Sequence, residues 1–409
     1  MNFTDLRKFV APETIFGVGA VDLAGQYAGK FGISKPLVVT DPGVLAAGWA
    51  ARVMESLAAF DIEGVIFSEI TPNPKAAEVM AGVAAYEAGE CDGLVAVGGG
   101  SPMDCAKGIG IVVSNGGHIL DYEGVDKIII PMPPLICIPT TAGTSADVSQ
   151  FAIINDTDRQ TKIAIISKTI IPDVALIDPQ TLMTKSPYLI ACTGMDALAH
   201  AIEAFVSSAH SPMTDVHALE AIRLVHGNLL ESFLHPEDME LKAKTMLGSM
   251  QAGLAFSNAS LGAVHALAHS LGGYKDLPHG ECNALLLPHV VDFNFSAAPE
   301  RFRTIAETMG LDARGMSSSE IRAWLIESMT SLRSSLGIKD RLASKGIRAS
   351  DIPVLSDKAV LDPCLVTNPK AANKRDIQVN RGTQLVKLIL ILDQTYLFHQ
   401  ARGREKLQT

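Results

Sequence analysis

The sequence predicts an α/β domain with a parallel sheet, followed by an all-helical domain. Through roughly residue 184, short runs rich in Val and Ile alternate with helix-like segments, a rhythm typical of βαβ units. Beyond Pro187 the strand-like runs disappear, and long segments rich in Ala, Leu, Met, His and Glu follow. A chain of 409 residues is also long enough for two domains. We therefore expect one domain over 1–184 and a second over 185–384.

The expected strands are nearly continuous apolar runs, the pattern of parallel strands that are buried on both faces of a sheet. Helices are expected over Ala46–Ala59 and after Pro74. The apolar runs lie at 35–41, 63–70, 92–100, 133–141, 151–156, 161–167 and 172–179. In the second half, Gly and Pro break the helical pattern into separate helices.

Composition favours small-molecule chemistry. The formal charge of -10 is spread along the chain, and no Lys/Arg cluster alternates with aromatic residues, so a nucleic-acid partner is not expected. We expect no membrane association and a cytoplasmic protein, because no apolar run reaches the roughly 18 residues of a membrane span and the first segment lacks a secretory apolar core. Six cysteines without CxxC spacing predict reduced thiols; for Cys105, a packing role is favoured over a reactive one.

Four potential metal ligands stand in two clusters within the helical half. Asp196 and His200 are four residues apart, so a helix would place them on one face about one turn apart. His265 lies in a second helix-like stretch, and His279 follows Pro278, where that helix must stop. Any one of these histidines alone would suggest a satisfied core imidazole. Together with the carboxylate they predict a mononuclear metal site.

A glycine-rich turn joins a strand to a helix in the first half. The run ending at Val97 leads into Gly98, Gly99, Gly100 and Ser101, and Pro102 opens the following helix-like stretch. Glycines let backbone N–H groups approach an oxyanion, and a helix N-terminus favours negative charge, so the pyrophosphate of a dinucleotide would fit here. An ordinary glycine turn is the alternative.

Asp41 ends the strand-like run 35–41. An acid in this place can bind a ribose 2′-hydroxyl and repel the 2′-phosphate of NADP, which favours NAD. It precedes the glycines in the chain, the reverse of the usual dinucleotide fingerprint. A turn-forming aspartate before Pro42 and Gly43 explains it equally well.

A hydroxyl-rich loop follows the run 133–141, and such loops commonly contact phosphate or ribose, although turn formers and helix caps look the same. The possible hydroxyl donors of this loop are Thr140, Thr141, Thr144, Ser145 and Ser149. Lys162 could pair with a phosphate or the ribose, or could be solvated.

The glycine loop and the metal cluster lie in different halves of the chain. We therefore expect the active site between the domains.

Four motifs in this order, GGGSPMDCAK, IPTTAGTSADVS, GMDALAHAIEAF and GAVHALAHSLGGYKDLPHGECNALLLPH, resemble the iron-dependent (group III) alcohol dehydrogenase family over roughly residues 5 to 380. The resemblance implies a dehydroquinate synthase-like architecture and Fe²⁺, with Zn²⁺ possible, held by Asp196, His200, His265 and His279. His269 would assist proton transfer near the substrate. It also implies NAD bound by Asp41, Asn73, Gly99, Gly100, Ser101, Thr140, Thr141, Ser149 and Lys162.

The implied reaction is reversible hydride transfer between a primary alcohol or diol and NAD, giving an aldehyde, with the metal polarising the substrate oxygen. A homodimer or higher homo-oligomer is the family default. A zinc-dependent glycerol dehydrogenase-like enzyme, a dehydroquinate synthase-like enzyme and a non-catalytic NAD- and metal-binding protein are the alternatives.

Two positions depart from the family pattern. Asp147 stands where many members carry glutamate, and the sequence after DIQV differs from the usual ending. We expect an atypical tail at 385–409, with a helix over Leu385–Phe398 and a role in self-association.

Overall fold

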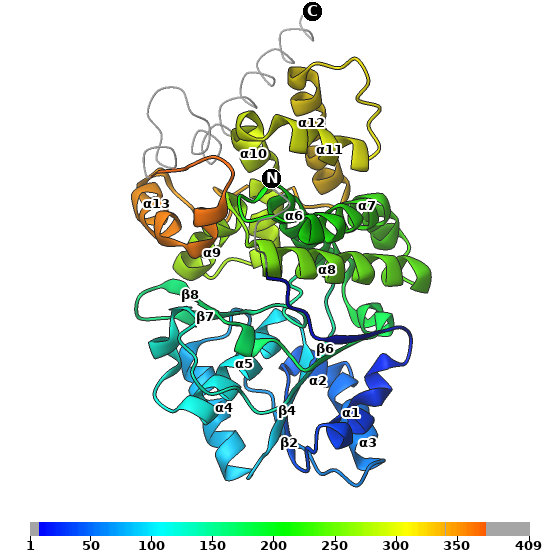
Figure 1. Cartoon of the computed structure of the whole chain (residues 1–409), viewed down its shortest axis with the longest axis vertical. Helices are drawn as coiled ribbons and strands as arrows, with labels where there is room; N and C mark the ends of the chain where they lie inside the picture. The colour runs from blue at the N-terminus through cyan, green and yellow to red at the C-terminus, as the bar shows by residue number, and fades with distance from the viewer. Residues whose placement is uncertain (1–7, 340, 374–409) are drawn as a thin grey trace, which may run out of the picture.

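The computed structural model describes residues 8–339 and 341–373, and these form an α/β unit below a helical unit (Figure 1). The expected atypical tail, 385–409, lies outside the described residues. The expected combination of a parallel-sheet domain and a helical domain is confirmed.

A six-stranded parallel sheet forms the centre of the first unit, in the order β1-β9-β6-β4-β2-β3. Its strands are β1 (Glu13–Phe16), β2 (Pro36–Val39), β3 (Val65–Phe67), β4 (Gly93–Gly98), β6 (Leu135–Pro139) and β9 (Val174–Ile177). Both faces are covered by helices: α1 (Ala24–Lys30), α2 (Pro42–Ala46), α3 (Trp49–Ala58), α4 (Ala76–Ala88) and α5 (Gly100–Asn115). Val38 belongs to the core beside α1 and α3, whereas Leu37 and Val39 belong to the core beside α4 and α5. This alternation explains why the strands are apolar throughout.

One sequence expectation about this unit was wrong, and the bounds of another differ. The runs 151–156 and 161–167 were expected as parallel strands, but β7 (Phe151–Asp156) and β8 (Thr161–Ile166) pair antiparallel, in a separate three-stranded sheet with β5 (Gly124–Val125). The segment between them is too short for a crossover, which parallel strands require. The helix expected over Ala46–Ala59 is found as α3, but it begins at Trp49 because α2 ends at Ala46 and Gly48 between them has a left-handed φ of 85°.

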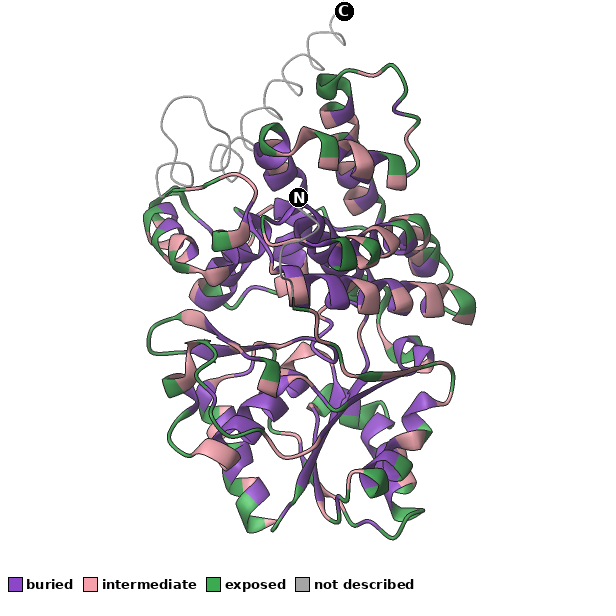
Figure 2. Ribbon diagram, in the orientation of Figure 1, coloured by how far each residue is buried: buried purple, intermediate pink, exposed green. Residues whose placement is uncertain are grey.

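The helical unit surrounds α6 (Pro187–Val206), which is buried along nearly its whole length (Figure 2). Among the described residues, α6 is the one helix long and apolar enough to cross a membrane, and 94% of its most apolar window is buried inside the protein, as in a core helix. The other helices are α7 (Pro212–Leu234), α8 (Met239–Ala259), α9 (Ala263–Lys275), α10 (His279–Asn294), α11 (Pro299–Thr308), α12 (Ser318–Ser335) and α13 (Ile352–Leu361).

Hydrogen bonds join the two units. Asn258 on α8 accepts from the backbone N–H of Val10 at 2.7 Å and donates to its carbonyl at 3.0 Å. The hydroxyl of Ser145, in the loop after β6, donates to the carbonyl of Ser249 on α8 at 2.7 Å. The Ser145 contact fixes the loop that contains Thr140 and Thr144 against the helical unit, and the Asn258 contacts fix the N-terminal segment.

Candidate functional site

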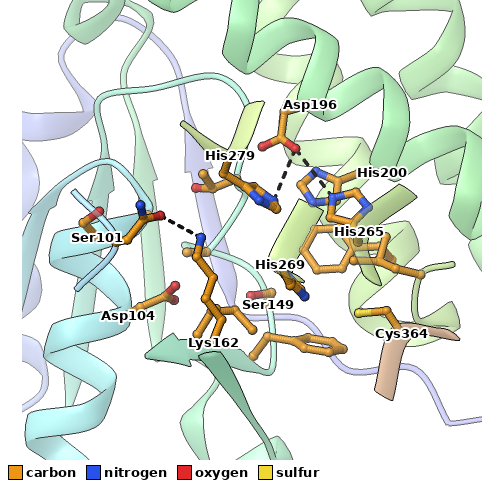
Figure 3. A pocket seen from close by; sticks show the side chains of 18 of the residues that line it. Ser101, Asp104, Ser149, Lys162, Asp196, His200, His265, His269, His279 and Cys364 are labelled. Carbon is orange, nitrogen blue, oxygen red and sulfur yellow. Dashed lines mark hydrogen bonds and ion pairs between the residues drawn. The ribbon is translucent and has the colours of Figure 1, made fainter. Parts of the chain in front are cut away.

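The four residues expected to bind a metal project from three helices and come together (Figure 3). Asp196 and His200 project from α6, His265 from α9, and His279 is the first residue of α10. Ligand atoms of Asp196, His265 and His279 lie within 4.8 Å of one another. The His200 ring stacks on that of His265, with ring centroids 4.3 Å apart.

The spacing of these atoms fits a metal ion. Oδ1 of Asp196 lies 3.5 Å from Nε2 of His265 and 3.8 Å from Nε2 of His279. With metal–ligand bonds of about 2.1 Å, two ligand atoms of a tetrahedral site would lie about 3.4 Å apart. Nδ1 of His279, the ring nitrogen other than the one nearest Asp196, is buried and has no hydrogen-bond partner among the described residues.

Asn283, one turn after His279 on α10, was missed by sequence reasoning. Its side-chain amide nitrogen contacts Oδ1 of Asp196 and lies 3.1 Å from Nε2 of both His265 and His279. Once Nε2 of His265 has lost its proton, the three atoms that converge on this NH₂ group offer more lone pairs than its two hydrogens can satisfy. A cation would satisfy the remainder.

Hydrogen bonds behind the imidazoles fix their orientation. Nδ1 of His200 lies 3.1 Å from the carbonyl oxygen of Gly143, and Nδ1 of His265 lies 2.6 Å from Oε2 of Glu203. Partners of this kind, on the ring nitrogen away from the metal, are usual for metal-binding histidines. Glu203 follows His200 by three residues on α6 and shares the face of Asp196 and His200, so this second carboxylate could have been recognised from its spacing in the sequence.

Burial and mutual charge set the protonation of the cluster. Burial alone would raise the pKa of Asp196, but the nearby imidazoles of His200 and His279 hold it far below its usual range. Burial lowers the pKa of His200 to about 3 and that of His279 well below its usual value, while hydrogen bonds to Asp196 and Glu203 outweigh burial and raise the pKa of His265 to about 9. The carboxylate is therefore ionised and the imidazoles of His200 and His279 are neutral, as metal ligands must be, whereas His265 would have to release a proton to bind a metal.

The metal cluster forms one wall of an inner cavity of about 150 Å³. The remaining wall is largely apolar, with Phe151, Phe256 and Leu261 facing the cluster and Cys364 closing one side. His269, one turn after His265, also lines it, and Nδ1 of His269 lies 2.8 Å from Oδ2 of Asp362. Of the residues expected to bind the coenzyme, Ser149 and Lys162 lie here rather than in the outer cleft.

An outer cleft of about 840 Å³ adjoins the inner cavity and shares Asp196 and His279 with it. Residues of both units line this cleft. Seven of the expected coenzyme contacts are among them: Asp41, Asn73, Gly99, Gly100, Ser101, Thr140 and Thr141.

The glycine loop leaves its backbone accessible to a ligand in the outer cleft. β4 ends at Gly98 and α5 begins at Gly100, so the helix N-terminus points into the cleft. A Cβ on Gly99 would lie 3.2 Å from Thr141, and one on Gly100 would lie 3.0 Å from Thr144, so side chains there would fill the cradle. Oγ1 of Thr140 is buried without a partner among the described residues. These features suit a phosphate group.

Asp41 and Asn73 have protein partners of their own. Oδ1 of Asp41 accepts from the backbone N–H of Val44 at 2.9 Å, so Asp41 caps α2 as well as facing the cleft. Asn73 donates to Oδ1 of Asp276 at 2.6 Å, across the cleft, and accepts from Nζ of Lys162 at 2.7 Å. Lys162 is therefore hydrogen-bonded within the protein, not freely solvated.

The cysteines match the sequence expectation, since all six are free and buried. Burial raises the pKa of the Cys105 thiol, which favours the packing role.

Comparison with known proteins agrees with this geometry. The family model "Iron-containing alcohol dehydrogenase" matches residues 11–179, and "Fe-containing alcohol dehydrogenase family, C-terminal" matches 190–380. The 1,3-propanediol dehydrogenase of Klebsiella pneumoniae is 38% identical over 379 residues, covering 92% of this chain and 98% of the relative. The NAD-dependent methanol dehydrogenase of Bacillus methanolicus is 37% identical over 369 residues, covering 90% and 97%.

Among solved structures, a 1,3-propanediol oxidoreductase superposes with a TM-score of 0.89 at 37% identity, covering 91% of this chain and 98% of that one. The family models, the relatives and the fold agree over nearly the whole chain. The protein belongs to the iron-containing alcohol dehydrogenase family.

Proposed function

We propose that the protein transfers hydride reversibly between a small primary alcohol or diol and NAD, with Fe²⁺ held by Asp196, His200, His265 and His279. The observation that carries this proposal is the convergence of one ionised carboxylate and three imidazoles on an inner cavity that adjoins a glycine-lined cleft. A divalent metal ion would act there as a Lewis acid on the substrate oxygen, while NAD would accept the hydride.

The lining of the inner cavity supports an uncharged substrate. Phe151 and Phe256 pack against each other with ring centroids 5.8 Å apart, and Phe256 stacks on His200 at 4.3 Å. The one lysine or arginine that lines the cavity, among the described residues, is Lys162, which is hydrogen-bonded to Asn73. A phosphorylated acid, the kind of substrate a dehydroquinate synthase binds, would require several basic groups. A short alcohol or diol fits this lining better.

The outer cleft supports NAD as the coenzyme. The N-terminus of α5, with Gly99 and Gly100, would receive the pyrophosphate, and the carboxylate of Asp41 would accept hydrogen bonds from a ribose. Ser149 and Lys162, which line the inner cavity, would meet the nicotinamide end of the coenzyme. His269 would exchange a proton with the substrate from the cavity wall.

The test is NADH formation, followed by absorbance under anaerobic conditions with a panel of short alcohols and diols. The protein is first stripped of metal and then restored with Fe²⁺ or with Zn²⁺. Turnover of an alcohol by the iron-restored protein is the expected result. Turnover with zinc alone would favour a glycerol dehydrogenase-like enzyme, and metal and NAD binding without NADH would contradict the proposed reaction.

A substitution at His269 separates proton transfer from metal binding. His269→Ala should lower turnover on the order of 10²-fold or more, as expected when a general acid–base group is lost. Metal content should stay at the wild-type level, because the hydrogen-bond partner of His269 is Asp362, and His269 meets the cluster through ring contacts with His279 and His265. Loss of metal from this variant would instead make His269 a ligand.

A homodimer is our proposal for the assembly, and analytical ultracentrifugation of the full chain would test it.

A further inference from the structure

The buried carboxylate of Asp362 contacts His269 on the ring nitrogen Nδ1. Oδ2 of Asp362 lies 2.8 Å from Nδ1 of His269, and both side chains are 8% exposed. The two residues are far apart in sequence, since His269 lies on α9 and Asp362 follows the end of α13. Folding of the C-terminal segment therefore brings the carboxylate to the histidine.

The position of Asp362 is itself fixed by local structure. Asp362 caps the short 3-10 turn Pro363–Thr367, and its Oδ1 accepts from the backbone N–H of Cys364 at 2.8 Å. Cys364 also lines the inner cavity, so this turn places Cys364 in the cavity wall and Asp362, two residues earlier, beside Nδ1 of His269. Because Oδ1 is held by the backbone of Cys364, Oδ2 of Asp362 is directed at the imidazole of His269.

These bonds define which nitrogen of His269 carries the proton. An ionised carboxylate has no hydrogen to donate, so the bond at 2.8 Å requires an N–H at Nδ1. A neutral imidazole then has its lone pair on Nε2, the nitrogen away from Asp362. His269 lines both the inner cavity and a second cavity of about 360 Å³, whereas Asp362 lines the second alone. The pair thus forms part of the wall between the two, with the imidazole on the substrate side.

Other charged groups around the second cavity have partners of their own. Arg159 pairs with Glu123 at 2.7 Å, and Nζ of Lys358 donates to the carbonyls of Arg159 and Gln160 at 2.8 Å each. Among the described residues, His269 and Cys364 are the donors to the Asp362 carboxylate. Oδ2 of Asp362 therefore has His269 as its hydrogen-bond partner.

We propose that Asp362 is a positioning residue for alcohol oxidation, holding the ring of His269 so that Nε2 presents its lone pair to the substrate hydroxyl. This inference rests on the proposed function. It assigns a role to a residue that touches neither substrate nor metal cluster and acts through His269 alone.

Asp362→Asn tests the proposal, because asparagine has nearly the same shape and can still accept from Cys364. Its NH₂ group can donate to Nδ1, which would move the imidazole proton to Nε2 and leave no lone pair facing the substrate. We expect kcat to fall on the order of 10²-fold. Metal content and NADH affinity should remain at the wild-type level. Asp351→Asn is the matched control, since Asp351 bonds Tyr274 on α9 at 3.3 Å without lining either cavity.

A double variant separates positioning from general damage to the fold. If Asp362 acts through His269, Asp362→Asn should have no further effect on kcat in a His269→Ala background. A purely structural role for Asp362 would lower kcat again by a similar factor. Wild-type kcat in the Asp362→Asn single variant, or additive losses in the double variant, would overturn the proposal.

Nitrogen NMR of the zinc-loaded protein gives a readout that does not depend on activity. We expect the Nδ1-protonated tautomer of His269 in the wild type and the Nε2-protonated tautomer in Asp362→Asn, with the signal assigned by its loss in His269→Ala. An Nε2-protonated wild type would contradict the inference. If the wild-type protein oxidises no alcohol but shows the expected tautomers, the proposed function fails while the geometric inference stands.

Discussion

Glu203 accepts two hydrogen bonds from the start of α9, one from the ring of His265 and one from the backbone of Val264, both at 2.6 Å. The carboxylate and the imidazole are almost completely buried, with side-chain exposures of 2% and 1%. Glu203 lies on α6, the helix that also bears Asp196 and His200. One side chain therefore fixes the two helices of the cluster relative to each other.

Glu203→Gln should weaken metal binding by roughly 10- to 100-fold, the usual effect of losing an outer partner of a metal-binding histidine. The amide keeps the size of the carboxylate, but its NH₂ group cannot accept, so one of the two bonds to α9 is lost. The rate of metal transfer to a chelator measures the change. Glu220→Gln is the control, because Glu220 pairs with Arg223 at the surface. Equal transfer rates for Glu203→Gln and the wild type would show that Glu203 has no such role.

Asp41 combines two roles that sequence reasoning treated as alternatives, since it caps α2 and also faces the cleft. Asp41→Asn should separate them. Asparagine is an equally good helix cap, so the unfolding free energy should change little, whereas Asp41→Ala should lose about 1 kcal/mol. Both variants remove the charge that would repel a 2′-phosphate, so both should raise the ratio of kcat/KM with NADP to kcat/KM with NAD. An unchanged coenzyme ratio in both variants would leave Asp41 as a helix cap alone.

The sequence was most informative where function depends on local spacing. Asp196 and His200 share a face of α6 because they are four residues apart, and Gly99 and Gly100 lie where β4 passes into α5. Both features could be predicted because one regular element brings the residues together.

Features formed by distant segments could not be predicted in this way. Nothing near Asp362 in the sequence indicates that its carboxylate meets His269, because the contact depends on how the turn after α13 packs against α9. The apolar runs of β7 and β8 do not distinguish parallel from antiparallel pairing. The two strands pair antiparallel because the connection between them is too short for a crossover.

Asp104 on α5 should make stability depend on pH. It lines the inner cavity, and burial raises its pKa to about 7 despite the nearby Lys107 and Lys162. The folded protein therefore keeps a proton that the unfolded chain releases near pH 4, so this group's contribution to stability falls as pH rises from about 4 to about 7. Asp104→Asn removes the contribution.

The measurement is the difference in melting temperature between Asp104→Asn and the wild type, both metal-free, at about pH 5 and about pH 8. We expect the melting temperature of Asp104→Asn, relative to that of the wild type, to be higher at about pH 8 than at about pH 5. Comparing the two proteins cancels the titration of the metal-cluster histidines, which both share. A difference that is the same at both pH values would show that Asp104 is ionised in the folded protein throughout.

Lys107 on α5 is a lysine whose side chain is fully buried. Its Nζ donates to the carbonyls of Ser149 and Phe151 at 2.8 Å each, so α5 is tied to the segment that enters β7. Lys107→Met keeps the length of the side chain but leaves two buried carbonyls without this donor. We expect a loss of about 2–4 kcal/mol in unfolding free energy, measured by denaturant titration.

Lys30→Met is the matched control for Lys107→Met, because Lys30 pairs with Glu13 at the surface with 54% of its side chain exposed. A surface ion pair contributes at most about 1 kcal/mol, so this variant should unfold near the wild-type midpoint. Ser149 and Phe151 both line the inner cavity, so Lys107→Met should also raise KM for the alcohol if β7 shifts. Wild-type stability of Lys107→Met would mean that the two carbonyls find water or other donors, and that the buried cation is not what holds β7 against α5.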